Sequence, residues 1–178
     1  MKGKTLVLVG YMGSGKSYVG KRLAKQLGIP FVDLDDLIVK DQGCPITKIF
    51  ETKGQDAFRE IEHRLLIEQL SKAEPAVLAT GGGAPCFMGN MDLIKSQSFS
   101  VFLDADIPVL AKRLETEIDK RPILHGQTRE TLPGFIEAKM RERRPFYELA
   151  DCTISIYRLS QNPVASIAEL YLSWSAEN

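Results

Sequence analysis

Short apolar runs alternate with longer segments of mixed polarity along the chain. Four of these runs are four or five residues long and consist mainly of aliphatic side chains, over 5–9, 29–32, 76–79 and 100–103. A strand that is covered on both faces is expected to be such a continuous apolar run. The runs therefore predict buried strands of a mainly parallel sheet, and 153–157 predicts a last strand.

Between these runs, apolar residues recur every three or four positions, which is typical of one face of a helix. Val19, Leu23 and Leu27 show this spacing after the first run, and Gly28 is expected to end that helix. The same pattern predicts helices over 34–42, 45–53, 56–70 and 108–116, through residue 140 to near 145, and over 163–174. Residues 117–128 have mixed charges and no apolar period, so they predict a mobile loop.

Strands that alternate with helices indicate a three-layer α/β fold with a mainly parallel sheet. The chain has 178 residues, which is the size of one domain, and 44% of them are hydrophobic. Lys+Arg and Asp+Glu both number 23, so the formal net charge is zero. This balance gives no overall field that would attract nucleic acid or an anionic membrane.

Targeting signals are not found in the sequence. The apolar run 6–9 is shorter than the ~7–15 residues of a signal-peptide core, and no stretch approaches the ~20 apolar residues of a membrane span. Cys44, Cys86 and Cys152 lie far apart without zinc-binding spacing, which favours reduced thiols. We therefore expect a soluble, cytoplasmic protein with no membrane or nucleic-acid partner.

Residues 10–17, GYMGSGKS, match the phosphate-binding pattern G-x-x-x-x-G-K-[ST]. The glycines Gly13 and Gly15, with Ser14 between them, are expected to turn backbone N–H groups toward a nucleotide phosphate. Lys16 would reach the β- and γ-phosphates, and the Ser17 hydroxyl would bind Mg²⁺. The alternative is a tight glycine turn with a solvated lysine, but the position between a buried strand and a helix favours a P-loop.

A P-loop indicates that the protein binds a nucleotide, but it does not identify the molecule that accepts the phosphate. Asp33 and Asp35 follow the second strand, where ligands bind in open α/β sheets. One carboxylate could serve Mg²⁺ and the other an acceptor hydroxyl. Alternatively, Asp35 or Asp36 could simply cap the next helix.

Glycines and arginines limit further which chemical class of acceptor the protein could bind. Gly81–Gly83 follows the third strand and would either break it or let a ligand approach the backbone closely. Arg59, Arg121 and Arg143 taken singly are typical surface groups. Together with the aspartates they indicate an anionic, hydroxylated acceptor, because a guanidinium binds a carboxylate through two N–H groups.

Six motifs in this order resemble the shikimate kinase family: the P-loop, Asp33-x-Asp35, Phe58-Arg59-x-x-Glu62, Gly81-Gly82-Gly83, Arg121-Pro122 and Arg143-x-Pro145-x-Tyr147. The resemblance covers residues 4–165. It implies a single P-loop kinase domain of the nucleoside monophosphate kinase type with a five-stranded parallel sheet, a substrate-binding segment near 34–62 and a lid near 113–127. It also implies transfer of the γ-phosphoryl group of MgATP to the 3-hydroxyl of shikimate, giving shikimate 3-phosphate and ADP.

The resemblance also implies roles for single residues. The shikimate pocket would consist of Asp35 at the reacting hydroxyl, Arg59 and Arg143 at the carboxylate, and Gly81, Gly82 and Gly83. Nucleotide contacts would come from Gly13, Ser14, Gly15, Lys16, Ser17 and Tyr18, from Arg113 packed on adenine, and from Arg121 in the lid. Catalysis would rest on Lys16, Asp35 and Arg121, and Asp33 would orient Mg²⁺ through water. ATP and shikimate are the expected partners of a monomer.

Two positions depart from the family pattern. The stretch between Arg113 and Arg121 is about one residue longer, and Arg144 places a second arginine beside Arg143. Pro145 and Tyr147 favour Arg143 as the residue that faces the carboxylate. Asp36 is assigned to helix capping.

Two other functions compete with this interpretation. One is another small-metabolite kinase of the same fold, such as gluconate kinase. A neutral polyol acceptor would not need both Arg59 and Arg143. A catalytically silent nucleotide-binding module would need neither these arginines nor the pair Asp33 and Asp35.

Overall fold

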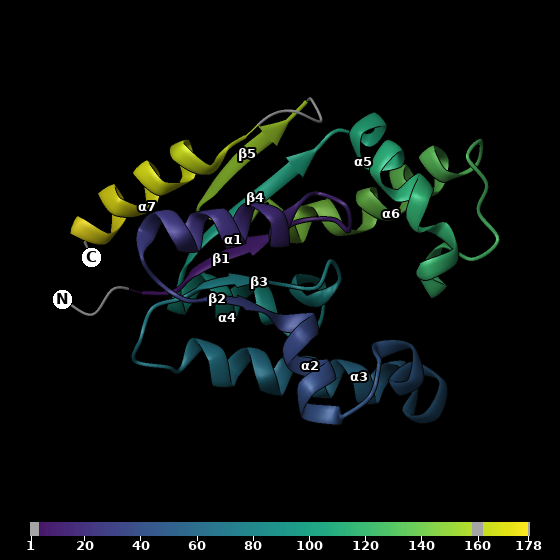
Figure 1. Ribbon diagram of the computed structural model, residues 1–178, viewed down its shortest axis with the longest axis horizontal. Helices are drawn as coiled ribbons and strands as arrows, with labels where there is room; N and C mark the ends of the chain where they lie inside the picture. The colour runs from purple at the N-terminus through teal and green to yellow at the C-terminus, as the bar shows by residue number, and fades with distance from the viewer. Residues whose placement is uncertain (1–3, 158–161, 178) are drawn as a thin grey trace.

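A five-stranded parallel sheet forms the centre of the protein (Figure 1). The computed structural model describes residues 4–157 and 162–177. The strands lie in the order β2-β3-β1-β4-β5 and run over Leu6–Val9 (β1), Phe31–Asp33 (β2), Val77–Ala79 (β3), Phe99–Ala105 (β4) and Cys152–Ile156 (β5). The prediction of an α/β fold with a parallel sheet is confirmed.

Helices cover both faces of the sheet, and together with it they make three layers (Figure 1). The helices α1 and α7 pack side by side on one face, and α4 lies on the other. The α-helices are α1 (Lys16–Leu27), α2 (Leu34–Gln42), α3 (Ile46–Leu70), α4 (Asn90–Gln97), α5 (Ile107–Leu114), α6 (Leu132–Tyr147) and α7 (Val164–Glu177). Three 3₁₀-helices are η1 (Ala84–Cys86), η2 (Glu115–Lys120) and η3 (Pro122–Leu124).

The core is centred on β1, which lies between β3 and β4. All four β1 residues are completely buried, and β3 is buried throughout. This burial explains why these strands consist only of apolar residues. Because all strands are parallel, the segments that follow β1, β2 and β3 meet at one edge of the sheet.

The helix α6 ends at Tyr147, near the predicted end at Pro145. Three details differ from the sequence prediction. The helices expected over 45–53 and 56–70 form one helix, α3, with a break at Gly54 (φ 83°, ψ 179°). Residues 117–128 were expected to lack regular structure, yet η2 and η3 occupy much of this segment. The pattern also did not predict α4.

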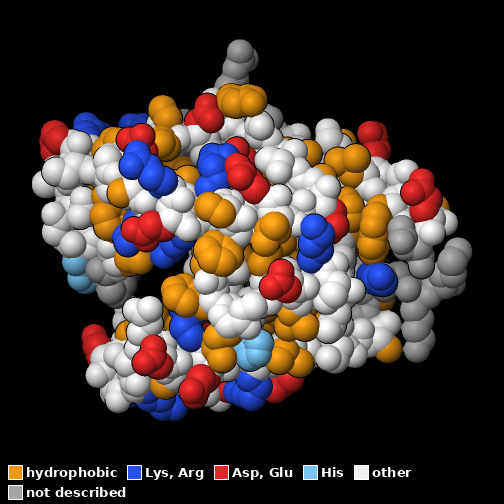
Figure 2. Space-filling view, turned by 180° about the vertical axis from the view of Figure 1, so that it is seen from behind, with side chains coloured by type: hydrophobic (Ala, Val, Ile, Leu, Met, Phe, Trp, Pro, Cys, Tyr) orange, Lys and Arg blue, Asp and Glu red, His pale blue; other side chains and the backbone are white. Residues whose placement is uncertain are grey.

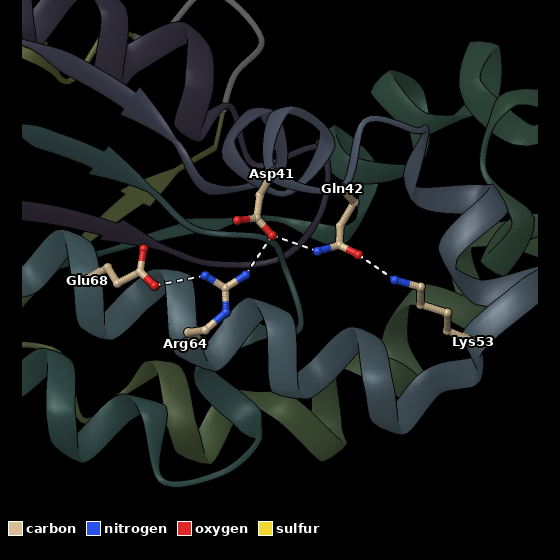
Figure 3. Close-up of polar contacts among 5 residues, drawn as sticks. All are labelled: Asp41, Gln42, Lys53, Arg64 and Glu68. Atoms are coloured by element: carbon tan, nitrogen blue, oxygen red, sulfur yellow. Dashed lines mark hydrogen bonds and ion pairs between the residues drawn. The ribbon is translucent and has the colours of Figure 1, made fainter.

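Polar side chains connect α2 with α3 at the surface (Figure 3). Arg64 on α3 pairs with Asp41 on α2 at 2.6 Å and with Glu68 at 2.8 Å. Gln42 accepts a 2.7 Å hydrogen bond from Lys53 and donates one to Asp41. Exposed ion pairs of this kind add little to stability. They connect α2 with α3, and both helices carry predicted site residues.

The first described residue of the chain contacts the last helix. The Tyr171 hydroxyl donates a 2.7 Å hydrogen bond to the carbonyl of Lys4. The Lys4 ammonium lies over the Trp174 ring, 5.4 Å from its centroid. These contacts lie near the start of β1, at the edge of the sheet opposite to the P-loop (Figure 1).

Candidate active site

The P-loop connects β1 to α1. Gly15 has φ 100° and directly precedes α1, so this position requires a left-handed backbone that favours glycine. The Lys16 ammonium donates hydrogen bonds to the carbonyls of Gly10 at 2.8 Å and Tyr11 at 3.0 Å. Burial lowers the pKa of Lys16 to about 8, although the carboxylates of Asp35 and Asp33 oppose this shift. The loop therefore holds a buried cation near the two predicted carboxylates.

Asp33 joins three elements of the site. Its Oδ2 accepts a 2.6 Å hydrogen bond from the Ser17 hydroxyl on α1, and its Oδ1 accepts a 3.1 Å bond from the backbone N–H of Asp35. Asp33 is thus the N-cap of α2, and the assignment of this role to Asp36 was wrong. The reason is that β2 runs directly into α2, so Asp36 lies inside the first turn with an exposed side chain.

Asp35 lies in the first turn of α2 and is largely enclosed by other groups. Burial raises the pKa of its carboxyl, and the neighbouring Asp33 raises it further, while Lys16 and Arg121 lower it. The glycine turn after β3 approaches this carboxylate closely. A Cβ atom at Gly81 would lie 2.9 Å from Asp35 Oδ1 and 3.0 Å from Glu62 Oε1.

Arg59 and Glu62 form a buried ion pair on α3, beside the same glycine turn. The Arg59 guanidinium lies over the Phe87 ring at 4.2 Å, and a Cβ atom at Gly83 would come within 2.6 Å of its Nη2. Burial raises the pKa of Glu62, an effect that the charge of Arg59 opposes. The absence of side chains at Gly81 and Gly83 therefore makes room for charged side chains of the protein itself, and not only for a ligand.

The two adjacent arginines on α6 have different neighbours. Arg144 binds Asp104 at the end of β4 through two hydrogen bonds of 2.7 and 2.9 Å. Arg143 lies over the Tyr11 ring, 5.6 Å from its centroid. Within 4–157 and 162–177, no carboxylate lies within ion-pair distance of Arg143. Arg143 is therefore the arginine that faces the P-loop and is available to an anion.

Arg113 and Arg121 approach the P-loop from the segment that we expected to be a lid. Arg113 on α5 donates hydrogen bonds to the carbonyls of Gly13 at 2.9 Å and Ser14 at 3.0 Å. Arg121 lies 3.8 Å from Glu117, and its buried Nε has no hydrogen-bond partner in the described part of the chain.

One cavity of about 220 Å³ collects most of the predicted residues. Its lining comprises Met12, Gly13, Gly15, Lys16, Ser17, Tyr18, Asp33, Asp35, Thr80, Gly81, Gly82, Arg113 and Arg121. The predicted residues Ser14, Arg59, Gly83 and Arg143 do not line it. Figure 2 shows a hollow at one edge of the molecule, between the segment that follows α5 and the part formed by α2 and α3. A larger cavity of about 440 Å³ between α5 and α6 contains none of the predicted residues.

Comparison with known proteins identifies the family. The model of the family described as "Shikimate kinase" matches residues 12–174. The shikimate kinase of Parabacteroides distasonis is 42% identical over 156 residues, which cover 88% of this chain and 90% of the relative. This chain belongs to the shikimate kinase family. The shikimate kinase of Bacteroides fragilis is also 42% identical, over 82% of this chain and 81% of its own length.

Solved structures of the shikimate kinase family have the same fold. The crystal structure of the Bacteroides thetaiotaomicron enzyme has a TM-score of 0.85 and 34% identity, covering 98% of this chain and 99% of that one. The Acinetobacter baumannii enzyme in complex with shikimate has a TM-score of 0.83 and 32% identity, covering 99% and 94%. A gluconokinase from Sinorhizobium meliloti has a TM-score of 0.53 and 21% identity, covering 99% and 93%, which shows a shared fold alone.

Sequence reasoning assigned no role to three residues at this site. Glu62 belongs to a quoted motif, but only its burial and its pairing with Arg59 mark it as more than a surface acid. Tyr147 donates a hydrogen bond to the carbonyl of Gly82 and packs on Phe102. Thr80 donates a 3.1 Å hydrogen bond to the Leu8 carbonyl and lines the cavity. The i,i+3 spacing of Arg59 and Glu62 could have indicated their ion pair. The partners of Tyr147 and Thr80 lie more than sixty positions away, so local spacing could not reveal those contacts.

Proposed function

We propose that this chain transfers the γ-phosphoryl group of MgATP to the 3-hydroxyl of shikimate, giving shikimate 3-phosphate and ADP. As a member of the shikimate kinase family, the chain is an ATP-dependent kinase that phosphorylates shikimate. The observation that carries the assignment of roles is the shared cavity. It is lined by Lys16 for the phosphate, Asp35 for the acceptor hydroxyl and Arg121 from the expected lid.

The P-loop would bind the phosphates of ATP. Backbone N–H groups of residues 13–17 would surround the β-phosphate at the positive end of α1. The Lys16 ammonium, whose present partners are two carbonyls, would exchange them for phosphate oxygens. Arg121 would reach the γ-phosphate from the other side. These cations stabilise negative charge on the group in transfer, which is the main contribution that a protein makes to such reactions.

Asp35 would hold the acceptor hydroxyl and accept its proton. A carboxyl group with a raised pKa is a better proton acceptor than an ordinary surface aspartate. Lys16 and Arg121 oppose this rise, because their positive charges favour the ionised carboxylate that accepts the proton. The proton would move from the hydroxyl to a carboxylate oxygen as the new P–O bond forms.

Arg59 and Arg143 would bind the carboxylate of shikimate. Both are half-buried, and they come from different helices, Arg59 from α3 beside Gly83 and Arg143 from α6 over the Tyr11 ring. Arg59 is fixed by Glu62, whereas Arg143 has no carboxylate within ion-pair distance in the described residues. A guanidinium without a carboxylate partner is suited to bind the carboxylate of a substrate. An uncharged polyol acceptor would leave this charge without a counterion.

The residues Ser17 and Asp33 fit a magnesium ion. Both present oxygen atoms at the cavity, and oxygen is the ligand that Mg²⁺ prefers. Across 4–157 and 162–177, no group of three or more His, Cys, Asp or Glu side chains could hold a metal by itself. In kinase sites Mg²⁺ is usually held by one or two protein oxygen ligands together with nucleotide phosphates. When bound, Mg²⁺ neutralises charge on the phosphate oxygens.

The segments near 34–62 and 113–127 would close over the substrates as a substrate-binding segment and a lid. Closure would exclude water, which otherwise competes with the hydroxyl as acceptor. We also propose that the enzyme acts as a monomer in the cytoplasm. The three cysteines are free thiols, as is usual in a reducing compartment such as the cytoplasm. In the described residues, no helix is both long and apolar enough to cross a membrane.

A single assay tests the proposed function. ADP release from MgATP is measured with shikimate, gluconate or a nucleoside monophosphate as acceptor, for the wild type and for Asp35→Asn. We expect release with shikimate only, and a strong loss in Asp35→Asn. Release that does not depend on shikimate would refute the proposal, and light scattering of the same sample would test the monomer.

A further inference from the structure

Tyr11, the second residue of the P-loop, contacts both halves of the site. Its carbonyl accepts hydrogen bonds from the Lys16 ammonium at 3.0 Å and from the backbone N–H of Ser14 at 3.1 Å. Its side chain is completely buried, and its ring lies under the guanidinium of Arg143. One residue thus touches the cation expected at the phosphates and the cation expected at the acceptor carboxylate.

Contact with Arg143 depends on the aromatic ring and not on the hydroxyl. The ring centroid lies 5.6 Å from Arg143 Cζ, which is within the range of a cation–π interaction. The Tyr11 hydroxyl is buried and has no hydrogen-bond partner in the described part of the chain. A buried hydroxyl without a partner lowers stability. Therefore the ring, and not a polar contact, accounts for an aromatic residue at this position.

Arg143 has few other groups to hold it. Tyr147 lies one turn later on α6, and the positive charge of Arg143 lowers the pKa of its hydroxyl, against the larger effect of burial. Tyr147 is itself fixed, because it donates to the carbonyl of Gly82 and packs on Phe102 with ring centroids 5.2 Å apart. Tyr11 and Tyr147 therefore both lie next to the Arg143 guanidinium, which lacks a carboxylate partner within 4–157 and 162–177.

We propose that Tyr11 is a positioning residue for Arg143, and that its ring sets the affinity of the enzyme for the carboxylate of the acceptor. The ring holds the guanidinium in the orientation in which the carboxylate binds, so less side-chain freedom is lost on binding. The inference rests on the proposed function, specifically on Arg143 as a carboxylate ligand. It extends that function by assigning acceptor affinity to a P-loop side chain.

The test compares variants that keep the ring with variants that lose it. Tyr11→Phe keeps the ring and removes only the unpartnered hydroxyl, so the KM for shikimate should stay within about twofold. Tyr11→Leu and the unbranched Tyr11→Met lose it, and the KM for shikimate should rise about tenfold. The KM for ATP and kcat should change much less, by about threefold or less. If Tyr11→Leu folds poorly, Tyr11→Met gives the same comparison with a flexible side chain that adapts to the vacated space.

A double variant separates positioning from a general loss of stability. Arg143→Met alone should raise the KM for shikimate, and Tyr11→Met added to it should raise this KM no further, because the ring would have no guanidinium to hold. Additive effects, or equal rises in both KM values for Tyr11→Met, would overturn the inference. A wild type that does not phosphorylate shikimate would instead refute the proposed function, so the two failures can be distinguished.

Discussion

The Ser17 hydroxyl donates a 2.6 Å hydrogen bond to Asp33, and this contact links the P-loop helix to the end of β2. The other oxygen of the same carboxylate caps α2. One side chain thus serves the proposed metal site and the helix that carries Asp35. Replacement of Asp33 should therefore have two effects, on metal dependence and on stability, which different substitutions can separate.

Asp33→Asn should weaken the use of Mg²⁺ without weakening the fold. Asparagine caps helices about as well as aspartate, but it lacks the negative charge that attracts the ion. We expect the Mg²⁺ concentration for half-maximal activity to rise about tenfold, with an unchanged melting temperature. Asp33→Ala should lose the cap as well and lower the free energy of unfolding by about 1 kcal/mol. Equal metal dependence in wild type and Asp33→Asn would contradict the proposed metal site.

The lowered pKa of Lys16 predicts an alkaline limit for ATP use. Lys16 is protonated below its pKa of about 8 and loses its charge above it. Because the free enzyme then lacks the ammonium that attracts phosphate, kcat/KM for ATP should fall with rising pH above about 8. The Lys16→Arg variant remains charged, so kcat/KM for its residual activity should not fall above this pH. A pH profile of kcat/KM for both proteins measures the difference, and the same limb in Lys16→Arg would assign it to another group.

The lowered pKa of Lys16 should make stability rise with pH, whereas it should make ATP use fall. Between about pH 8 and the ordinary lysine pKa of 10.5, the unfolded chain holds this proton and the folded protein does not. The contribution of Lys16 to the free energy of unfolding therefore rises with pH in this window.

Asp35→Asn should lose activity and gain stability. As the proposed proton acceptor, Asp35 should contribute about 100-fold to kcat. Its raised pKa means that the folded state disfavours the ionised form, so the contribution to stability falls as pH rises from the ordinary value of 3.8 through the folded pKa. At pH 7 the neutral asparagine avoids this penalty. Urea unfolding at pH 7 should show a higher midpoint for Asp35→Asn, and a lower one would indicate that the carboxylate is needed for the fold.

Arg121→Ala should lower turnover while leaving shikimate binding nearly intact. An arginine that approaches transferring phosphate contributes about 10³-fold or more to kcat. Arg129→Ala is the matched control from the same region, because Arg129 is exposed and pairs with Glu115. Its kcat should stay close to that of the wild type. An equal loss of shikimate affinity and turnover in Arg121→Ala would count against the lid assignment.

Much of the architecture follows from local sequence. The apolar runs correspond to strands because each strand near the centre is covered on both faces, as the complete burial of β1 shows. The P-loop pattern lies between β1 and α1, where the sequence predicts it. The helix α4 was missed because only Met91 and Ile94 are buried apolar residues among its eight positions, which is too few to establish a helical period.

Contacts between distant residues could not be predicted from the sequence. The orientation of Arg144 depends on Asp104, forty positions earlier. Arg113 binds P-loop carbonyls about a hundred positions away, so its expected contact with adenine stays a prediction. The cap of α2 depends on how directly β2 enters the helix, and capping preference alone does not distinguish Asp33 from Asp36.

The contact between Lys4 and Tyr171 brings both ends of the described chain to the edge of the sheet that lacks the active site. The exposed turn 72–74 lies at the same edge, directly before β3. A circular permutant that joins the ends of the chain and opens it within this turn would leave every loop of the active site uncut. The order of the strands along the chain is therefore separable from the chemistry, which needs only their spatial order.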